Sequence, residues 1–119
     1  MKRHLFALFF FAGVSSPTAI SAAPTFKKEV GAVFKAKCTK CHGLLLKQKG
    51  LSLRNLKSAL KGGESGAVII PGKPDESLLL KQFALPKTDP KRMPPITEKA
   101  QLTAAEKKLI EEWIRAGAK

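Results

Sequence analysis

Two thiols and an imidazole stand close together in the segment Cys38-Thr39-Lys40-Cys41-His42. The spacing Cys-x-x-Cys-His is the attachment signature of a c-type haem. Each thiol can add to one vinyl group of the same porphyrin, and the histidine after the second thiol then lies beneath the iron. A helix leading into the motif suits this geometry, because residues three and four apart share one helical face. The motif predicts covalent haem on Cys38 and Cys41, with His42 as the proximal iron ligand.

Three other chemistries use the same residue types. A thioredoxin-like redox pair belongs to alternating strands and helices, and no strand-period stretch precedes Cys38. A zinc site needs four ligands, and after residue 23 the chain has no cysteine or histidine besides Cys38, Cys41 and His42. A disulfide between the two cysteines would close a small loop and stabilise little. Haem attachment is favoured over these alternatives, which the sequence leaves open.

The N-terminal segment has the pattern of a secretory signal peptide. Lys2, Arg3 and His4 give it a positive start, residues 5–14 are mostly apolar, and residues 18–23 are rich in small side chains. The apolar run is shorter than the about 20 residues that span a bilayer. We therefore expect residues 1–23 to be a cleaved signal peptide and the protein to be periplasmic or otherwise exported. A retained membrane anchor is the alternative.

Residues 24–119 suffice for one compact domain, which we expect to be a monomer. The chain has 22 Lys and Arg against 9 Asp and Glu, and loss of Lys2 and Arg3 would lower its net charge from +13 to +11. This charge predicts electron-transfer partners with an acidic docking face, or serves only to solvate the domain. It is also compatible with peripheral contact with an anionic membrane. Nucleic acid is not expected, because the basic residues lack interleaved aromatic side chains.

The basic residues expected at the docking face fall into two groups. Around the haem motif they are Lys35, Lys37, Lys40 and Lys47, and around Met93 they are Lys87, Lys91 and Arg92.

The candidate for the second axial ligand of the iron follows from how few methionines the chain contains. The two methionines are Met1, expected to leave with the signal peptide, and Met93. Met93 stands in Arg92-Met93-Pro94-Pro95, where the prolines stiffen the chain. We predict Met93 as the distal ligand; an open high-spin iron or a lysine ligand are the alternatives. We also expect the other ring nitrogen of His42 to be held by a backbone carbonyl from residues 44–51.

Helical periodicity covers most of the chain after residue 23. Apolar residues recur at spacings of three and four in residues 25–37, 52–61, 74–85 and 103–117. Thr103 and Glu106 form a capping-box signature at the start of the last segment. Three glycines in residues 62–66 indicate positive φ angles or close approach to a bulky group. The pattern predicts an all-α domain in which the last helix crosses the first, with Trp113 in the packing between them. Contact of Trp113 with the haem is the alternative.

Several segments, taken in order, resemble the planctomycete-type cytochrome c domain. They are residues 34–38, Cys41-His42-Gly43, residues 50–53, 59–66 and 71–78, Met93-Pro94-Pro95, and residues 113–118. The resemblance covers essentially the whole of residues 24–119. It implies the class I cytochrome c fold, with three to five helices wrapped around one covalent haem c on Cys38 and Cys41, His42 as the proximal ligand and Met93 as the distal ligand.

These features predict an electron carrier rather than an enzyme, with no catalytic residues. Histidine and methionine ligands together raise the reduction potential of the iron and leave no coordination site for a substrate. We therefore expect an exported monohaem c-type cytochrome that transfers single electrons between redox partners. The alternative is a haem enzyme or a gas or ligand sensor with an open distal iron site, in which Met93 only packs.

Overall fold

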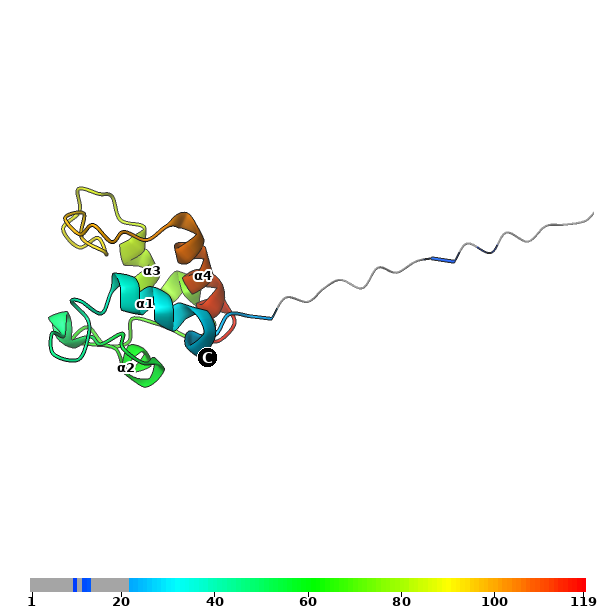
Figure 1. The fold of residues 1–119 in the computed structure, drawn as a ribbon, viewed down its shortest axis with the longest axis horizontal. Coiled ribbons are helices and arrows are strands. Elements are labelled where there is room, and N and C mark those ends of the chain that lie inside the picture. Colours follow the sequence, from blue (N-terminus) through cyan, green and yellow to red (C-terminus); the bar gives the residue numbers. More distant parts are fainter. Residues whose placement is uncertain (1–9, 11, 14–21) are drawn as a thin grey trace, which may run out of the picture.

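The computed structural model describes residues 10, 12, 13 and 22–119. In this part of the chain every regular element is helical and no strand is present, which confirms the predicted all-α class. The α-helices are α1 (Gly31–Lys37), α2 (Leu56–Lys61), α3 (Leu78–Phe83) and α4 (Ala104–Arg115), as Figure 1 shows. Single helical turns are η1 (Phe26–Val30), η2 (Gln48–Gly50) and η3 (Pro74–Glu76). The expected signal peptide, residues 1–23, lies outside the described residues except for 10, 12, 13, 22 and 23.

The first predicted helix, residues 25–37, is present and begins with a π-helical turn. Thr25 is its N-cap, and the Thr25 hydroxyl accepts a hydrogen bond of 3.2 Å from the amide of Lys28. The Glu29 carboxylate accepts one of 2.6 Å from the amide of Thr25. Side-chain oxygens thus accept hydrogen bonds from backbone amides of the first turn, which have no acceptor within the helix. The turn η1 leads directly into α1, which ends at Lys37, immediately before the first cysteine of the motif.

Helix α4 begins where the capping box predicted. The Thr103 hydroxyl accepts a hydrogen bond of 3.1 Å from the amide of Glu106, and the Glu106 carboxylate accepts one of 2.9 Å from the amide of Thr103. The helix ends before Gly117, which has a φ of 109° that side-chain-bearing residues rarely adopt. Residue types therefore predicted both ends of α4.

The two middle helices are shorter than the periodicity predicted. Helix α2 starts at Leu56 instead of Ser52, because the Asn55 side chain caps it by accepting a bond of 2.8 Å from the amide of Ser58. Residues 74–85 divide at Ser77 into η3 and α3. The buried Ser77 hydroxyl accepts a bond of 2.9 Å from the amide of Ile70. Neither bond changes the apolar spacing on which the predicted helix lengths rested.

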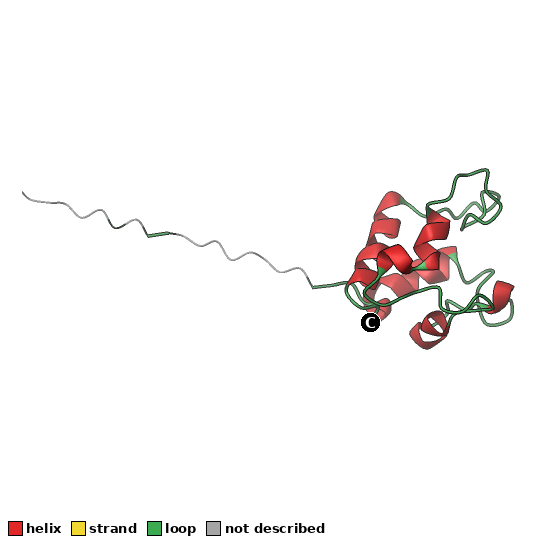
Figure 2. Ribbon diagram, turned by 180° about the vertical axis from the view of Figure 1, so that it is seen from behind, coloured by secondary structure: helices red, strands yellow, loops and turns green. Residues whose placement is uncertain are grey.

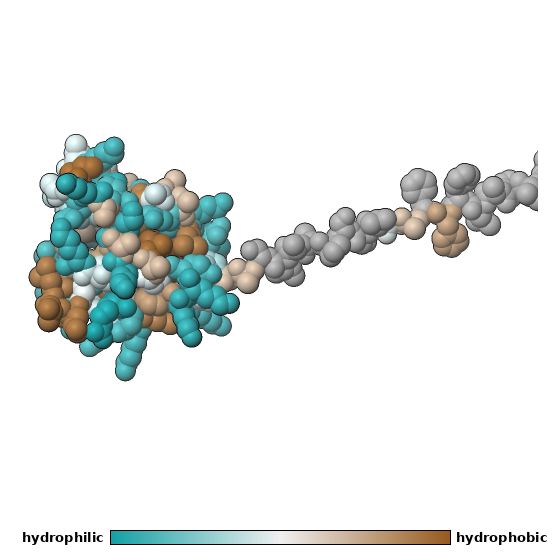
Figure 3. Space-filling view, viewed as in Figure 1, coloured by the Kyte–Doolittle hydropathy of each residue, from teal (hydrophilic) through white to brown (hydrophobic). Residues whose placement is uncertain are grey.

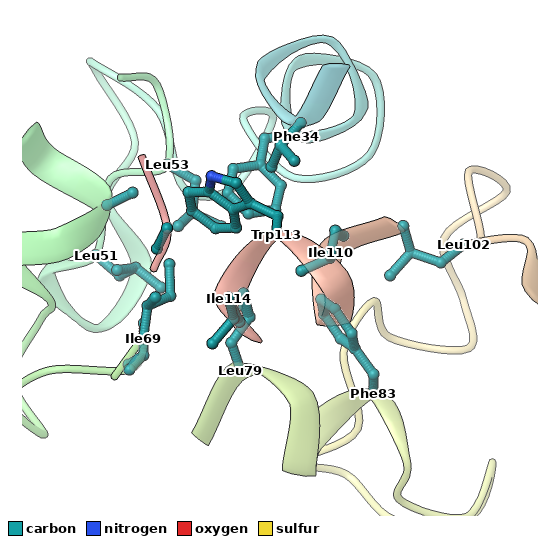
Figure 4. Close-up of a cluster of buried hydrophobic side chains, with 14 residues drawn as sticks. Phe34, Leu51, Leu53, Ile69, Leu79, Phe83, Leu102, Ile110, Trp113 and Ile114 are labelled. Carbon is teal, nitrogen blue, oxygen red and sulfur yellow. The ribbon is translucent and has the colours of Figure 1, made fainter. Parts of the chain in front are cut away.

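Aromatic packing joins the first and last helices, as predicted. Phe34 and Trp113 are fully buried, with ring centroids 5.9 Å apart and ring planes at 85°. The Trp113 indole donates a hydrogen bond of 3.0 Å to the carbonyl of Lys119. Figure 4 shows Ile110 and Ile114 on the same helix facing α3. Trp113 therefore belongs to the core between the helices, where the sequence placed it.

The body of the domain consists of α1, α3 and α4, and long loops project from the side opposite the C-terminus (Figures 1 and 2). The chain ends beside its first helical turn, where the amide of Phe26 donates a hydrogen bond of 2.8 Å to the carbonyl of Lys119. In the part of the chain described, no helix has both the length and the apolar character needed to cross a membrane.

Candidate functional site

Cys38, Cys41 and His42 lie in a tight turn at the end of α1. The amide of Cys38 donates a bond of 2.8 Å to the carbonyl of Phe34, which is the last bond of the helix. The amides of Cys41 and His42 both donate to the carbonyl of Cys38, at 3.2 and 2.9 Å. All three side chains of the motif line the same cavity. One local turn is thus enough to gather two thiols and an imidazole.

The His42 ring is held by the backbone of the loop that follows it. Its Nδ1 atom lies 3.1 Å from the carbonyl oxygen of Gln48. Because a carbonyl can only accept, Nδ1 must carry the proton in this contact, and the lone pair of the neutral ring is then on Nε2. The amide of Leu53 donates a bond of 2.8 Å to the His42 carbonyl. Gln48 lies within residues 44–51, where the sequence predicted the acceptor.

Met93 reaches this cavity from the proline-rich loop between α3 and α4. Its amide donates a bond of 3.2 Å to the carbonyl of Gln82 in α3, and its half-buried side chain packs against the core. Pro94 and Pro95 line the cavity beside it, and the Met93–Pro94 peptide bond is cis. Figure 1 shows this loop, in yellow and orange, on the same side of the domain as the loop that follows α1. The thioether thus shares one cavity with the thiols and the imidazole.

A buried hydrogen-bond network shapes the Met93 loop. Arg92 is only 9% exposed, and its Nη1 atom donates to the carbonyl of Pro94 at 3.0 Å and to Oε1 of Gln101 at 2.9 Å. The Gln101 Nε2 atom donates to the carbonyls of Pro95 and Glu98, at 2.7 and 2.8 Å. These bonds fold the loop back on itself, so the two side chains act as a scaffold for the position of Met93.

The rest of the cavity wall is largely apolar. Its apolar side chains include Leu51, Leu53, Val68, Leu78, Leu79 and Phe83. The glycine-rich loop also contributes, through Gly63 and Ser65. A Cβ atom at Gly63 would collide with the carbonyl of Lys49, so the close approach expected for this loop is present. An apolar wall that carries two thiols, an imidazole and a thioether fits a porphyrin with covalent and axial attachments.

Burial, together with smaller contributions from the charge of Glu106 and from Cys41, raises the pKa of the Cys38 thiol to about 12. Redox-active and zinc-binding cysteines need the opposite shift, because the thiolate is the reactive form. The surroundings of Cys38 favour an uncharged sulfur. A thioether bond to a haem would keep this sulfur uncharged, because a thioether has no proton to lose. In the described residues, no group of three or more His, Cys, Asp or Glu side chains is arranged to hold a metal ion. The site therefore fits haem attachment better than zinc or dithiol chemistry.

Two contributors to the site were not named from the sequence. Gln48 acts through its backbone carbonyl, which every residue type carries, so only the stretch that supplies it could be predicted. Gln101 acts through its side chain, in a loop that precedes a capped helix. A glutamine in such a position is usually solvated, and its type carries no signal of burial.

One comparison with known proteins found a match. The family model of planctomycete cytochrome c matches residues 38–96, which run from the first motif cysteine past Met93-Pro94-Pro95. No curated protein and no solved structure matches the chain. The cytochrome c family implies covalent haem c, and Cys38 and Cys41 are the two cysteines of the chain. This match confirms the resemblance to the planctomycete-type cytochrome c domain over residues 38–96.

Proposed function

We propose that this protein is an exported monohaem c-type cytochrome that carries single electrons between redox partners. The observation that carries the proposal is the convergence of Cys38, Cys41, His42 and Met93 on one cavity with a largely apolar wall. The family match, which includes both the motif and the Met93 loop, supports it. Both His42 and Met93, which could each ligate one iron, line this cavity.

Each residue has a distinct role in this proposal. Cys38 and Cys41 hold the macrocycle through thioether bonds, His42 binds the iron through Nε2, and Met93 binds it through sulfur. The haem itself supplies a one-electron couple, whose potential is raised by the methionine ligand. The Gln48 carbonyl keeps the His42 proton on Nδ1 and fixes the orientation of the ring. The proposal includes the class I cytochrome c fold, with helices around one haem.

Exclusion of water is the task of the cavity wall. Apolar side chains from three separate regions, represented by Leu53, Val68 and Phe83, border the space. An apolar shell controls solvent access to a metal centre and thereby its redox potential. Two fixed ligands and a wall that excludes water favour electron transfer. Neither the coordination nor the solvation of the iron then has to change much when the iron gains or loses an electron.

The visible absorption spectrum of the exported holoprotein tests this proposal. We expect sharp bands in the reduced state, and in the oxidised state the weak long-wavelength band of a thioether bound to ferric haem. The reduced protein should not bind carbon monoxide rapidly while it is folded. A high-spin spectrum with rapid, stoichiometric binding of carbon monoxide would favour the alternative, a haem enzyme or ligand sensor with an open distal site.

The proposed docking face for an acidic redox partner differs in membership from the set expected from the sequence. Lys40, Lys49 and Lys91 are exposed and line the mouth of the cavity. Two other expected members have structural roles and are corrected here. Arg92 is buried, and the Lys37 ammonium donates a bond of 2.8 Å to the carbonyl of Gln101. Electron transfer to an acidic partner should slow as salt is added, because salt screens the attraction.

Export and processing belong to the proposal and have simple tests. The mass of the protein recovered from the periplasm should correspond to loss of about 23 residues plus one haem, as expected for a cleaved signal peptide. Size-exclusion chromatography should show a monomer. Recovery in the membrane fraction with residues 1–23 intact would favour the retained anchor instead.

A further inference from the structure

The loop between His42 and Lys47 exposes three consecutive leucines. The exposed fractions are 57% for Leu44, 98% for Leu45 and 51% for Leu46. Single exposed leucines are ordinary on protein surfaces, whereas a contiguous apolar group indicates an interaction site. Figure 3 shows brown, hydrophobic atoms gathered at the lower left edge of the domain, where Figure 1 draws the loops between α1 and α2. We call residues 44–46 the leucine loop.

Backbone hydrogen bonds hold the leucine loop in place. The amide of Gly43 donates a bond of 2.8 Å to the carbonyl of Leu46, and His42 and Lys47 form an antiparallel bridge. The amide of Gln48 donates a bond of 3.0 Å to the carbonyl of Cys41. The loop is therefore a closed projection with its side chains outward. None of the three leucines lines the haem cavity, so a porphyrin bound there would leave them exposed.

Positive charge surrounds the leucine loop. Leu44 borders a shallow surface hollow together with Lys27, Lys35 and Arg54. Lys47 and Lys49 follow the loop and are both exposed.

Glu98 pairs with Lys40 at 3.0 Å, and the side chain of Glu64 lies beside the backbone of Gly50. The apolar projection thus stands within a predominantly basic surface.

We propose that the leucine loop inserts into the interfacial region of an anionic membrane, while the surrounding lysines and arginine contact lipid headgroups. Apolar side chains with a basic surround are the combination that binds anionic bilayers peripherally. A protein partner would need a pocket shaped for a convex projection, whereas a bilayer accepts one without a preformed site. The proposal goes beyond electron transfer and does not depend on the identity of the iron ligands.

Insertion at this loop would also set the orientation of the domain. The leucine loop begins two residues after His42, beside the motif that holds the haem. Docking through it brings that edge of the cavity close to the lipid surface. An electron carrier held in this way would meet redox partners embedded in the membrane.

Co-sedimentation of the exported holoprotein with lipid vesicles tests the proposal. Vesicles of phosphatidylcholine with about one third phosphatidylglycerol should bind the protein, and pure phosphatidylcholine should bind it much more weakly. Leu45→Ser should weaken binding to the anionic vesicles, and the combined variant L44S/L45S/L46S should weaken it roughly tenfold or more. K47Q/K49Q should also weaken it, with a smaller dependence on salt.

The matched control is Ile96→Ser, because Ile96 is another large apolar residue with 51% exposure. It should bind anionic vesicles as the parent does. Equal binding by the parent and by L44S/L45S/L46S would overturn the proposal, as would failure of the parent to bind. If L44S/L45S/L46S changed only turnover with a soluble redox protein, the loop would be a protein contact and the proposal would be wrong. An unaltered haem spectrum in each variant separates these outcomes from failure of the electron-carrier proposal.

Discussion

Gln101 ties the Met93 loop to the helix that carries the cysteine motif. Its side chain accepts a bond of 2.9 Å from the buried guanidinium of Arg92. Its backbone carbonyl accepts one of 2.8 Å from the ammonium group of Lys37, directly before Cys38. One residue thus connects the two walls of the cavity, which are far apart in the sequence. The spacing between the cysteine motif and the Met93 loop depends on this connection.

Replacing Gln101 with leucine should disturb both stability and the proposed Met93 ligation. The change removes three side-chain hydrogen bonds and leaves Arg92 buried with one acceptor fewer, which should cost about 1–3 kcal/mol in the free energy of unfolding. The thioether band of the oxidised protein should also weaken. Urea titration and visible spectroscopy measure the two effects. Lys99→Leu, an exposed change in the same loop, is the control and should leave both unchanged.

Removing the thioether of Met93 should open the distal side of the iron. Met93→Ala should abolish the long-wavelength band, give a high-spin ferric spectrum and allow rapid binding of carbon monoxide to the ferrous protein. Met93→Leu keeps most of the bulk without the sulfur and separates ligation from packing. Both variants should lose the band. A band that persists in Met93→Leu would mean that another group is the ligand.

Trp113→Phe should destabilise the packing between the first and last helices. The change removes the indole bond of 3.0 Å to the carbonyl of Lys119 and part of a fully buried side chain. We expect a loss of about 1–3 kcal/mol in the free energy of unfolding, with the absorption spectrum of the haem unchanged. Trp113→Ala should cost about 3–5 kcal/mol. A shift of the haem bands in Trp113→Phe would indicate contact between the indole and the haem.

Thr103→Ala should remove half of the capping box of α4. The Thr103 hydroxyl is the acceptor for the amide of Glu106, so its loss should lower the free energy of unfolding by about 1 kcal/mol. Urea titration of the holoprotein measures the change. Thr97→Ala, at an exposed position in the preceding loop, should have almost no effect. Equal stability of the two variants would contradict the assigned role of the cap.

Residue types predicted both ends of α4, but not the start of α2, where Asn55 is an equally local cap. Thr103 and Glu106 marked the start of α4, and Gly117 marked its end. The same reasoning overestimated the helix in residues 74–85, since Ser77 bonds to Ile70 and interrupts it. Apolar periodicity is unchanged by that bond, because Leu78, Leu79 and Phe83 still face inward. A serine hydroxyl that accepts a hydrogen bond from a backbone amide seven residues earlier leaves no apolar pattern at the site of the break.

By itself the sequence determined the local half of the site. Cys38, Cys41 and His42 are so close in the chain that one turn must bring them together, and the scarcity of methionine made Met93 the candidate across from them. Only the tertiary structure decided that Met93 shares their cavity, that Gln48 orients the imidazole, and that Gln101 connects Arg92 with Lys37. Those relations depend on backbone carbonyls and on a buried amide. Such groups acquire a role only when segments distant in sequence pack against one another.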